Sequence, residues 1–162
     1  MTPALAAAEL QGAGSLAAAL RVPTPVPWPP DLYEADDLER MAALLKNPGG
    51  SGWALYYIIQ RSPRVLVGVA GFGGPPNARG IVDIGYSVLE AYRRRGFASE
   101  AVAGLLDHAF RNRRVERVAA ETYPQLAASI GVLVRNGFAQ VSTDSDDGKL
   151  RYELKRPGRA GS

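Results

Sequence analysis

The chain has 162 residues, of which 46% are hydrophobic and 22% charged, as expected for one soluble globular domain with a proper core. A formal net charge of +3 is only mildly basic, and by itself it indicates no particular partner. Because the chain contains no cysteine, disulfides, thiolate zinc sites and cysteine nucleophiles are excluded. The single histidine, His108, makes a histidine metal site or a serine–histidine triad improbable.

No apolar run approaches the length needed to span a membrane. The first twenty residues are rich in alanine, but they lack a basic leader and include Glu9, unlike a secretory signal peptide. We therefore expect a cytoplasmic protein that has no membrane partner.

The N-terminal third is predicted to be helical on either side of a proline-rich segment. Residues 3–20 favour a helix that glycines interrupt. Residues 22–31, VPTPVPWPPD, are predicted to be extended, with Trp28 as a packing residue. Apolar residues at helical spacing predict a second helix at 34–46, which NPGGSG ends.

After residue 50 the pattern changes to β-branched and aromatic strands that alternate with shorter helices. The predicted order is strands at 53–60, 64–74 and 80–90, a helix at 99–111, a strand at 115–122, a helix at 127–138 and a strand at 150–156. The last strand follows an acidic turn, STDSDDGK. This order predicts an α/β or α+β fold built on a single sheet.

The stretch RRRGFASEAV at 93–102 joins the third predicted strand to the following helix. Its small residues leave the amides at the helix start uncovered, and a helix N-terminus offers unpaired N–H groups and the positive end of the dipole. Positive charge is added by Arg93, Arg94 and Arg95. These residues alone are compatible with a pyrophosphate site and equally with a solvated turn that bends at Gly96.

The residues around this stretch resemble a known family. Residues 93–98 read Arg-x-x-Gly-x-Ala, which resembles motif A of the GNAT superfamily of N-acetyltransferases, Gln/Arg-x-x-Gly-x-Gly/Ala. VDIGYSVLEAYRRRGFASEAVAGLLDHAF resembles the strand, phosphate loop and helix of the branch that includes ribosomal-protein alanine N-acetyltransferases. ETYPQLAASIGVLVRNGF resembles the next strand and helix of that branch, and the similarity covers about residues 53–154.

The resemblance implies the GNAT fold, which has a single mixed, mostly antiparallel sheet with helices on both faces. It implies one N-acetyltransferase domain at 1–156, with N-terminal helices and the proline-rich segment at 1–50, the family core at 53–154 and a flexible tail at 157–162. The implied cosubstrate is acetyl-coenzyme A, without a metal. In the family the fourth and fifth strands separate after running parallel, and the thioester lies in that gap.

The same resemblance implies where acetyl-coenzyme A binds. Main-chain groups of residues 94–99 would hold the pyrophosphate. The strand at Val88 and Leu89 would pair with the pantetheine arm as an added β-strand does. The implied coenzyme-binding residues are Val88, Leu89, Arg93, Arg94, Arg95, Gly96, Phe97, Ala98 and Ser99.

The absence of cysteine favours direct attack of a substrate amine on the thioester, which requires a base, an oxyanion donor and an acid. A main-chain N–H at Val88 or Leu89 is the candidate oxyanion donor. The candidate acid is Ser129, since this branch often has a serine near the coenzyme sulfur. A serine that only bonds the backbone near a helix start is the alternative.

Glu121, at the end of the fourth predicted strand, is the candidate base, acting directly or through water. Asp83 and Glu153 are alternatives, and each of the three carboxylates also fits an ordinary surface role. The chain departs from the family at Leu126, where an asparagine is usual, and at Leu133, where many relatives have a tyrosine acid. The first departure is expected to remove one polar contact with coenzyme A.

The leading hypothesis is an acetyl-coenzyme A-dependent N-acetyltransferase that acts on a small amine or a protein N-terminus. The alternative is a non-catalytic acyl-coenzyme A-binding module, which the change at Leu126 favours. Nucleic-acid binding is not expected, because residues 31–39 and 144–147 are acidic where a broad basic face would be required. The sequence identifies neither the acceptor amine nor the oligomeric state, and it is compatible with a homodimer.

Overall fold

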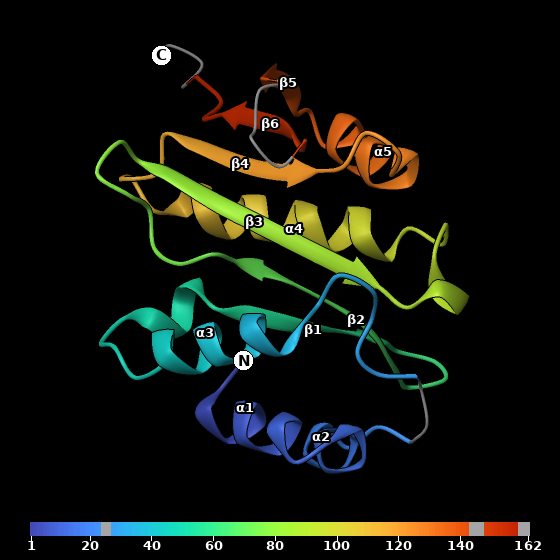
Figure 1. The fold of residues 1–162 in the computed structure, drawn as a ribbon. Helices are drawn as coiled ribbons and strands as arrows, with labels where there is room; N and C mark the ends of the chain where they lie inside the picture. Colours follow the sequence, from blue (N-terminus) through green and yellow to red (C-terminus); the bar gives the residue numbers. More distant parts are fainter. Residues whose placement is uncertain (24–26, 143–147, 159–162) are drawn as a thin grey trace.

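The computed structural model describes residues 1–23, 27–142 and 148–158, so most of the acidic turn lies outside the described residues. The strands are β1 (Leu55–Gln60), β2 (Val65–Phe72), β3 (Ile81–Val88), β4 (Arg117–Thr122), β5 (Ala139–Ser142) and β6 (Leu150–Lys155). They form one sheet in the order β1-β2-β3-β4-β6-β5 (Figure 1). Only β3 and β4 pair in parallel, which confirms the mixed, mostly antiparallel sheet.

The helices lie close to their predicted positions. They are α1 (Pro3–Leu10), α2 (Ala13–Leu20), α3 (Ala35–Leu44), α4 (Phe97–Arg111) and α5 (Ala127–Arg135), with short 3-10 helices η1 (Gly50–Trp53) and η2 (Glu90–Tyr92). The expected first strand starts later than predicted, because η1 includes Trp53. Strand β5 was not predicted, since it has four residues and those at 139–141 are exposed, so no apolar alternation marks it.

The two faces of the sheet are covered by different helices (Figure 1). On one face, α4 packs its buried residues Val102, Leu105 and Ala109 against alternate residues of β2, β3 and β4. On the other face, α1, α2 and α3 cover β1 and β2. The helices of the described ranges leave Asp83 of β3 and Glu121 of β4 exposed on this second face. No helix within these ranges is long and apolar enough to cross a membrane.

A buried carboxylate fixes the N-terminal helices to the sheet. Glu9 of α1 is only 8% exposed, and it accepts hydrogen bonds from Trp28 Nε1 at 2.7 Å, the Tyr33 hydroxyl at 3.2 Å and the Tyr57 hydroxyl at 2.6 Å. Burial, together with the Glu9 carboxylate, raises the pKa of both tyrosines, so they remain proton donors. The packing role predicted for Trp28 is confirmed, since its ring centroid lies 6.2 Å from each tyrosine ring.

Replacing Glu9 by glutamine should destabilise the fold by about 2 kcal/mol, because hydrogen bonds to a charged acceptor are stronger than those to an amide. Urea unfolding of the free protein measures this. Glu39→Gln is the matched control, since Glu39 is exposed on α3 and should change stability by no more than about 0.5 kcal/mol. Equal stability of the two variants would show that the Glu9 hydrogen bonds contribute nothing net.

Helix α5 begins without a polar cap, because its N-cap residue is Leu126, and no side chain caps the helix. An asparagine at this position should therefore stabilise the protein relative to alanine by about 1 kcal/mol, by accepting a hydrogen bond from the first turn. The measurement compares Leu126→Asn with Leu126→Ala in thermal unfolding, so that loss of the leucine is common to both. A less stable asparagine variant would contradict the prediction.

Candidate active site

The pairing between β3 and β4 ends before either strand does. Its last pair is Ile84 with Ala120. Beyond it, β3 continues beside β2 as far as Val88, and β4 continues beside β6 as far as Thr122. The carboxyl ends of the two parallel strands therefore separate at this point, which we call the splay, as the resemblance implied.

Backbone groups of β3 face the splay at alternate residues. Leu89 N donates to Val67 O at 2.8 Å, so the amide of Leu89 is directed to β2. Because successive residues of a strand direct their N–H and C=O to opposite sides, those of Tyr86 and Val88 are directed toward β4 and the splay. The Val88 carbonyl accepts a hydrogen bond from Arg93 Nε at 3.0 Å. Of the two predicted backbone donors, Val88 is the one that faces the splay.

The loop from β3 into α4 uses two left-handed residues. Arg94 has φ +61° and Gly96 has φ +85°. Gly96 is the N-cap of α4, and no side chain caps this helix start. A Cβ at Gly96 would meet no atom within 4 Å, so the glycine is required by its backbone conformation rather than by lack of space. The first-turn N–H groups of a 15-residue helix are therefore left to a ligand or to water.

The three consecutive arginines, which the sequence does not distinguish, make different contacts in the structure. Arg93 forms an ion pair with Asp31 at 2.6 Å. Arg95 donates to Gln60 Oε1 at 3.0 Å, and its guanidinium lies over the aromatic rings at 92 and 97. Arg94 is exposed and makes no side-chain hydrogen bond or ion pair within the described ranges. Of these three arginines, Arg94 is therefore the one whose guanidinium has no partner among the described residues.

Phe97, Ala98 and Ser99 form the half-buried first turn of α4. Asn136, the C-cap of α5, donates its Nδ2 hydrogen to the Ser99 hydroxyl at 3.1 Å. This contact fixes the beginning of α4 to the end of α5. Ser99 accepts in this contact, so its hydroxyl hydrogen remains able to donate to a ligand beside the backbone amides of the turn.

Ser129 lies in the first turn of α5, where a tyrosine from β3 reaches it. The Tyr86 hydroxyl lies 3.0 Å from Ser129 O and 3.1 Å from Ser129 Oγ. Burial raises the pKa of Tyr86, against smaller lowering effects of the Ser129 hydrogen bond and the Arg135 charge. Sequence reasoning did not connect the two residues, because they are 43 positions apart and no motif joins them. Leu133, the other departure from the family, is fully buried in the core.

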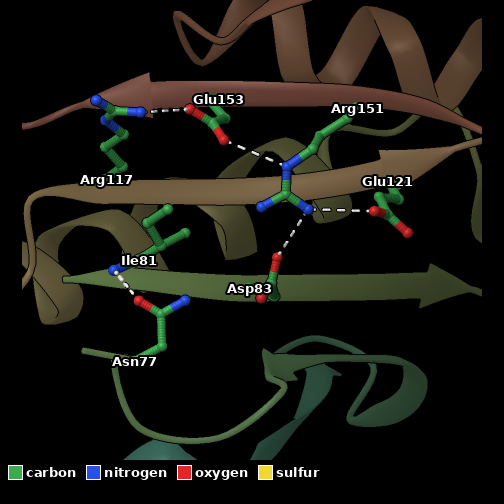
Figure 2. Close-up of polar contacts among 7 residues, drawn as sticks. All are labelled: Asn77, Ile81, Asp83, Arg117, Glu121, Arg151 and Glu153. Carbon is green, nitrogen blue, oxygen red and sulfur yellow. Dashed lines mark hydrogen bonds and ion pairs between the residues drawn. The ribbon is translucent and has the colours of Figure 1, made fainter. Parts of the chain in front are cut away.

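The three candidate bases share one cation on the face opposite α4 (Figure 2). Arg151 of β6 lies 3.1 Å from Glu121, 3.4 Å from Asp83 and 3.2 Å from Glu153, and Arg117 lies 3.4 Å from Glu153. Burial alone would lower the pKa of Arg151, but the surrounding carboxylates raise it overall. Arg151 and its three carboxylates together carry a net charge of −2, which Arg117 and Lys155 on the same face balance toward the other end of the strands.

A family model described as the acetyltransferase (GNAT) domain matches residues 5–139. An uncharacterised N-acetyltransferase of Bacillus subtilis (strain 168) is 31% identical over 112 residues, and one of Bacillus licheniformis is 30% identical over 129 residues. These alignments cover 68% and 80% of this chain. They cover 66% and 68% of the relatives, so the match spans about two thirds of their length.

Solved structures share the fold. A ribosomal-protein-alanine N-acetyltransferase from Brucella melitensis has a TM-score of 0.57 and 22% identity, covering 73% of this chain and 78% of its own. A Salmonella typhimurium protein solved with its cofactor acetyl-CoA has a TM-score of 0.52 and 23% identity, covering 60% and 62%. The family match extends over most of the sequence, from α1 into β5. The chain therefore belongs to the GNAT family of acetyltransferases.

Proposed function

We propose that this protein is an N-acetyltransferase that transfers the acetyl group of acetyl-coenzyme A to a primary amine of a small molecule or a protein N-terminus. The observation that carries the proposal is the position of the splay directly beside the uncapped start of α4. An anion site and a free strand edge are thereby adjacent, which suits a ligand with a pyrophosphate and an extended amide arm.

The residues present fit acetyl-coenzyme A at both ends of this site. Main-chain groups of residues 94–99 would hold the pyrophosphate. Arg94 would add a positive charge, because Arg93 and Arg95 already contact Asp31 and Gln60. The backbone of Val88 would pair with the pantetheine arm. A further supporting observation concerns Thr122 Oγ1, a buried hydroxyl oxygen at the end of β4. It has no hydrogen-bond partner within the described structure. Such an atom is rare in a folded protein and suggests a missing ligand group.

The chain's own residues suffice for direct transfer, in which the bound coenzyme supplies the acetyl group as a thioester. The Val88 N–H donates to the carbonyl oxygen as negative charge develops there. Glu121 takes a proton from the substrate ammonium, directly or through water, so that the free amine can attack, and Ser129 donates a proton to the departing sulfur. Asp83 is a better alternative base than Glu153, because a substrate can reach it more easily. The side chains of Asp83 and Glu121 are 56% and 42% exposed, whereas that of Glu153 is only 13% exposed.

The charged surface around Arg151 supports an amine as the acceptor. Asp83 and Glu121 share the single guanidinium of Arg151, so the charge around Arg151 is negative and attracts a cationic substrate. This cluster lies on the sheet face opposite α4. We propose that the acceptor approaches from this face, so that the two substrates meet at the splay from opposite sides.

Coenzyme protection tests the ligand. Millimolar acetyl-coenzyme A should raise the melting temperature by several degrees, since a ligand at about 100 times its dissociation constant adds about 2.7 kcal/mol. Free coenzyme A should protect comparably, because most contacts involve the pyrophosphate and pantetheine. NADH should protect little, since it has no pantetheine arm to pair with Val88. Equal protection by NADH would indicate a generic anion site, and no shift with any of the three would refute the proposal.

Two variants of Gly96 separate backbone strain from electrostatic repulsion. Gly96→Ala and Gly96→Glu both place a side chain at φ +85° and should lower the stability of the free protein by about 1–2 kcal/mol. Only the glutamate adds a negative charge at the helix start, so its affinity for acetyl-coenzyme A should fall by more than about tenfold relative to alanine. Titration calorimetry compares the two, and equal affinities would exclude this turn as the phosphate site.

Turnover separates an enzyme from a binding module. A panel of primary amines and peptide N-termini, followed by release of free thiol from acetyl-coenzyme A, should identify at least one acceptor. Glu121→Gln, assayed with that acceptor at saturating coenzyme, should lower kcat by about 10²-fold or more. Coenzyme protection without thiol release for any amine would instead support the non-catalytic alternative.

A further inference from the structure

We propose that Tyr86, Thr122 and Ser129 form a three-hydroxyl site that receives the sulfur of the coenzyme. Ser129 is the group that donates to the sulfur, Thr122 contacts the same end of the ligand, and Tyr86 is a positioning residue that directs the Ser129 hydroxyl and restores its proton. This inference rests on the proposed function, since it assumes that a coenzyme thioester reaches the splay.

The three hydroxyls come from the three elements that border the splay. Tyr86 belongs to β3, Thr122 to β4 and Ser129 to α5. Continuing the Ile84–Ala120 register by two residues sets Tyr86 opposite Thr122 across the splay. Strand alternation places both side chains on the α4 face, since Glu121 lies on the other face with Arg151.

The geometry of Tyr86 and Ser129 permits two arrangements of the hydroxyl hydrogens. The Tyr86 hydroxyl carries one proton but lies within hydrogen-bond distance of both Ser129 O and Ser129 Oγ. When Tyr86 donates to the carbonyl, the Ser129 hydroxyl can donate back to the tyrosine oxygen. When Tyr86 donates to Ser129 Oγ, the Ser129 hydrogen is free to point to a ligand. The second arrangement makes Ser129 a donor toward the splay.

Thr122 provides the independent indication that a ligand group belongs here. It is only 5% exposed, and its hydroxyl has no hydrogen-bond partner in the described residues. A buried hydroxyl without a partner lowers the stability of the free protein, and a hydrogen bond to a bound ligand would offset this loss. This hydroxyl lies across from Tyr86, and because it is covered in the free protein, its contact with the coenzyme requires a small shift of its neighbours.

The hydroxyl site completes the transfer step. The amine nitrogen forms the C–N bond as the C–S bond breaks and its electron pair moves to sulfur. The sulfur takes the Ser129 hydroxyl proton, and the Tyr86 hydroxyl proton replaces it on Ser129. Tyr86 regains a proton from solvent, while the proton lost by the amine passes to the base on the other face. No oxidant, reductant or further reactant is needed.

The same donors should favour the thiolate of bound coenzyme A, and this gives a test that needs no acceptor. A cysteine thiol ordinarily ionises at about pH 8.5, and the alkyl thiol of coenzyme A is a weaker acid. Because burial raises the pKa of Tyr86, this residue remains a donor while the thiol ionises. Arg135, on the same helix as Ser129, is the charged side chain that acts on Tyr86 in the described structure, and its positive charge also favours a thiolate.

The experiment measures dissociation constants for coenzyme A and for desulfo-coenzyme A, which lacks the sulfur, between about pH 6.5 and pH 9.5. In the wild-type protein the preference for coenzyme A should rise about tenfold across this range, the effect expected of a hydrogen bond to a charged group. Tyr86→Phe and Ser129→Ala should each lose most of this rise, while desulfo-coenzyme A binds as in the wild type. Tyr56→Phe removes a hydroxyl on β1 far along the sheet and should retain the full rise.

The outcomes separate the inference from the proposed function. If neither coenzyme A nor desulfo-coenzyme A binds, both fail. If both bind but the wild type shows no rise with pH, or Tyr86→Phe keeps it, only the hydroxyl site is refuted. Thermal unfolding of each free variant shows whether it is folded. If Tyr86→Phe does not fold, the pH dependence of Ser129→Ala provides the test of the hydroxyl site.

Thr122→Val adds a readout that a merely structural threonine would not give. Valine has a similar shape and removes the unpartnered hydroxyl, so the free protein should be no less stable than the wild type. Affinity for coenzyme A should nevertheless fall by about fivefold, through loss of one hydrogen bond. A less stable free protein with unchanged affinity would overturn the role of Thr122.

Discussion

The two parallel strands at the centre of the sheet are each held by a different antiparallel neighbour, and the candidate site depends on this arrangement. Strand β3 follows β2 to Val88, and β4 follows β6 to Thr122, so the two separate once their own pairing ends at Ile84 and Ala120. Separation leaves backbone groups of β3 without a strand beside them. The turn into α4 directly after β3 then brings a helix start to the same place.

The alternation of side chains along these strands gives the two faces of the splay different chemistry. One face carries neutral hydroxyls under the cover of α4, where burial keeps Tyr86 protonated. The other carries three carboxylates around the single guanidinium of Arg151, so the charge at this cluster is negative. In the proposed mechanism, the donors to the leaving sulfur and the acceptors for the amine proton therefore lie on opposite faces of the sheet. Acid and base can act together without neutralising each other, which is what a direct transfer requires.

The N-terminal helices have a supporting role that extends to the loop at 93–99. The buried Glu9 cluster fixes the segment that follows Trp28, and Asp31 in that segment pairs with Arg93. The Ser87 hydroxyl also donates to Asp31 O at 2.6 Å, so the same segment contacts the end of β3. A change in the N-terminal packing is therefore expected to alter the position of the loop at 93–99, because Asp31 pairs with Arg93.

The sequence by itself determined the order of the elements other than β5, the single sheet and the loop at 93–99, because hydrophobic periodicity and glycine at a helix start are local properties. That the sheet is mixed and mostly antiparallel followed from the family resemblance. The sequence could not distinguish Arg93 from Arg94 and Arg95, or Val88 from Leu89, since their roles depend on which distant group each one meets. It also left Tyr86 unconnected with Ser129, and β5 unassigned. Those features were decided by tertiary structure alone, because strand register and helix packing set which groups meet, from 14 positions apart for Ala139 and Glu153 to 43 for Tyr86 and Ser129.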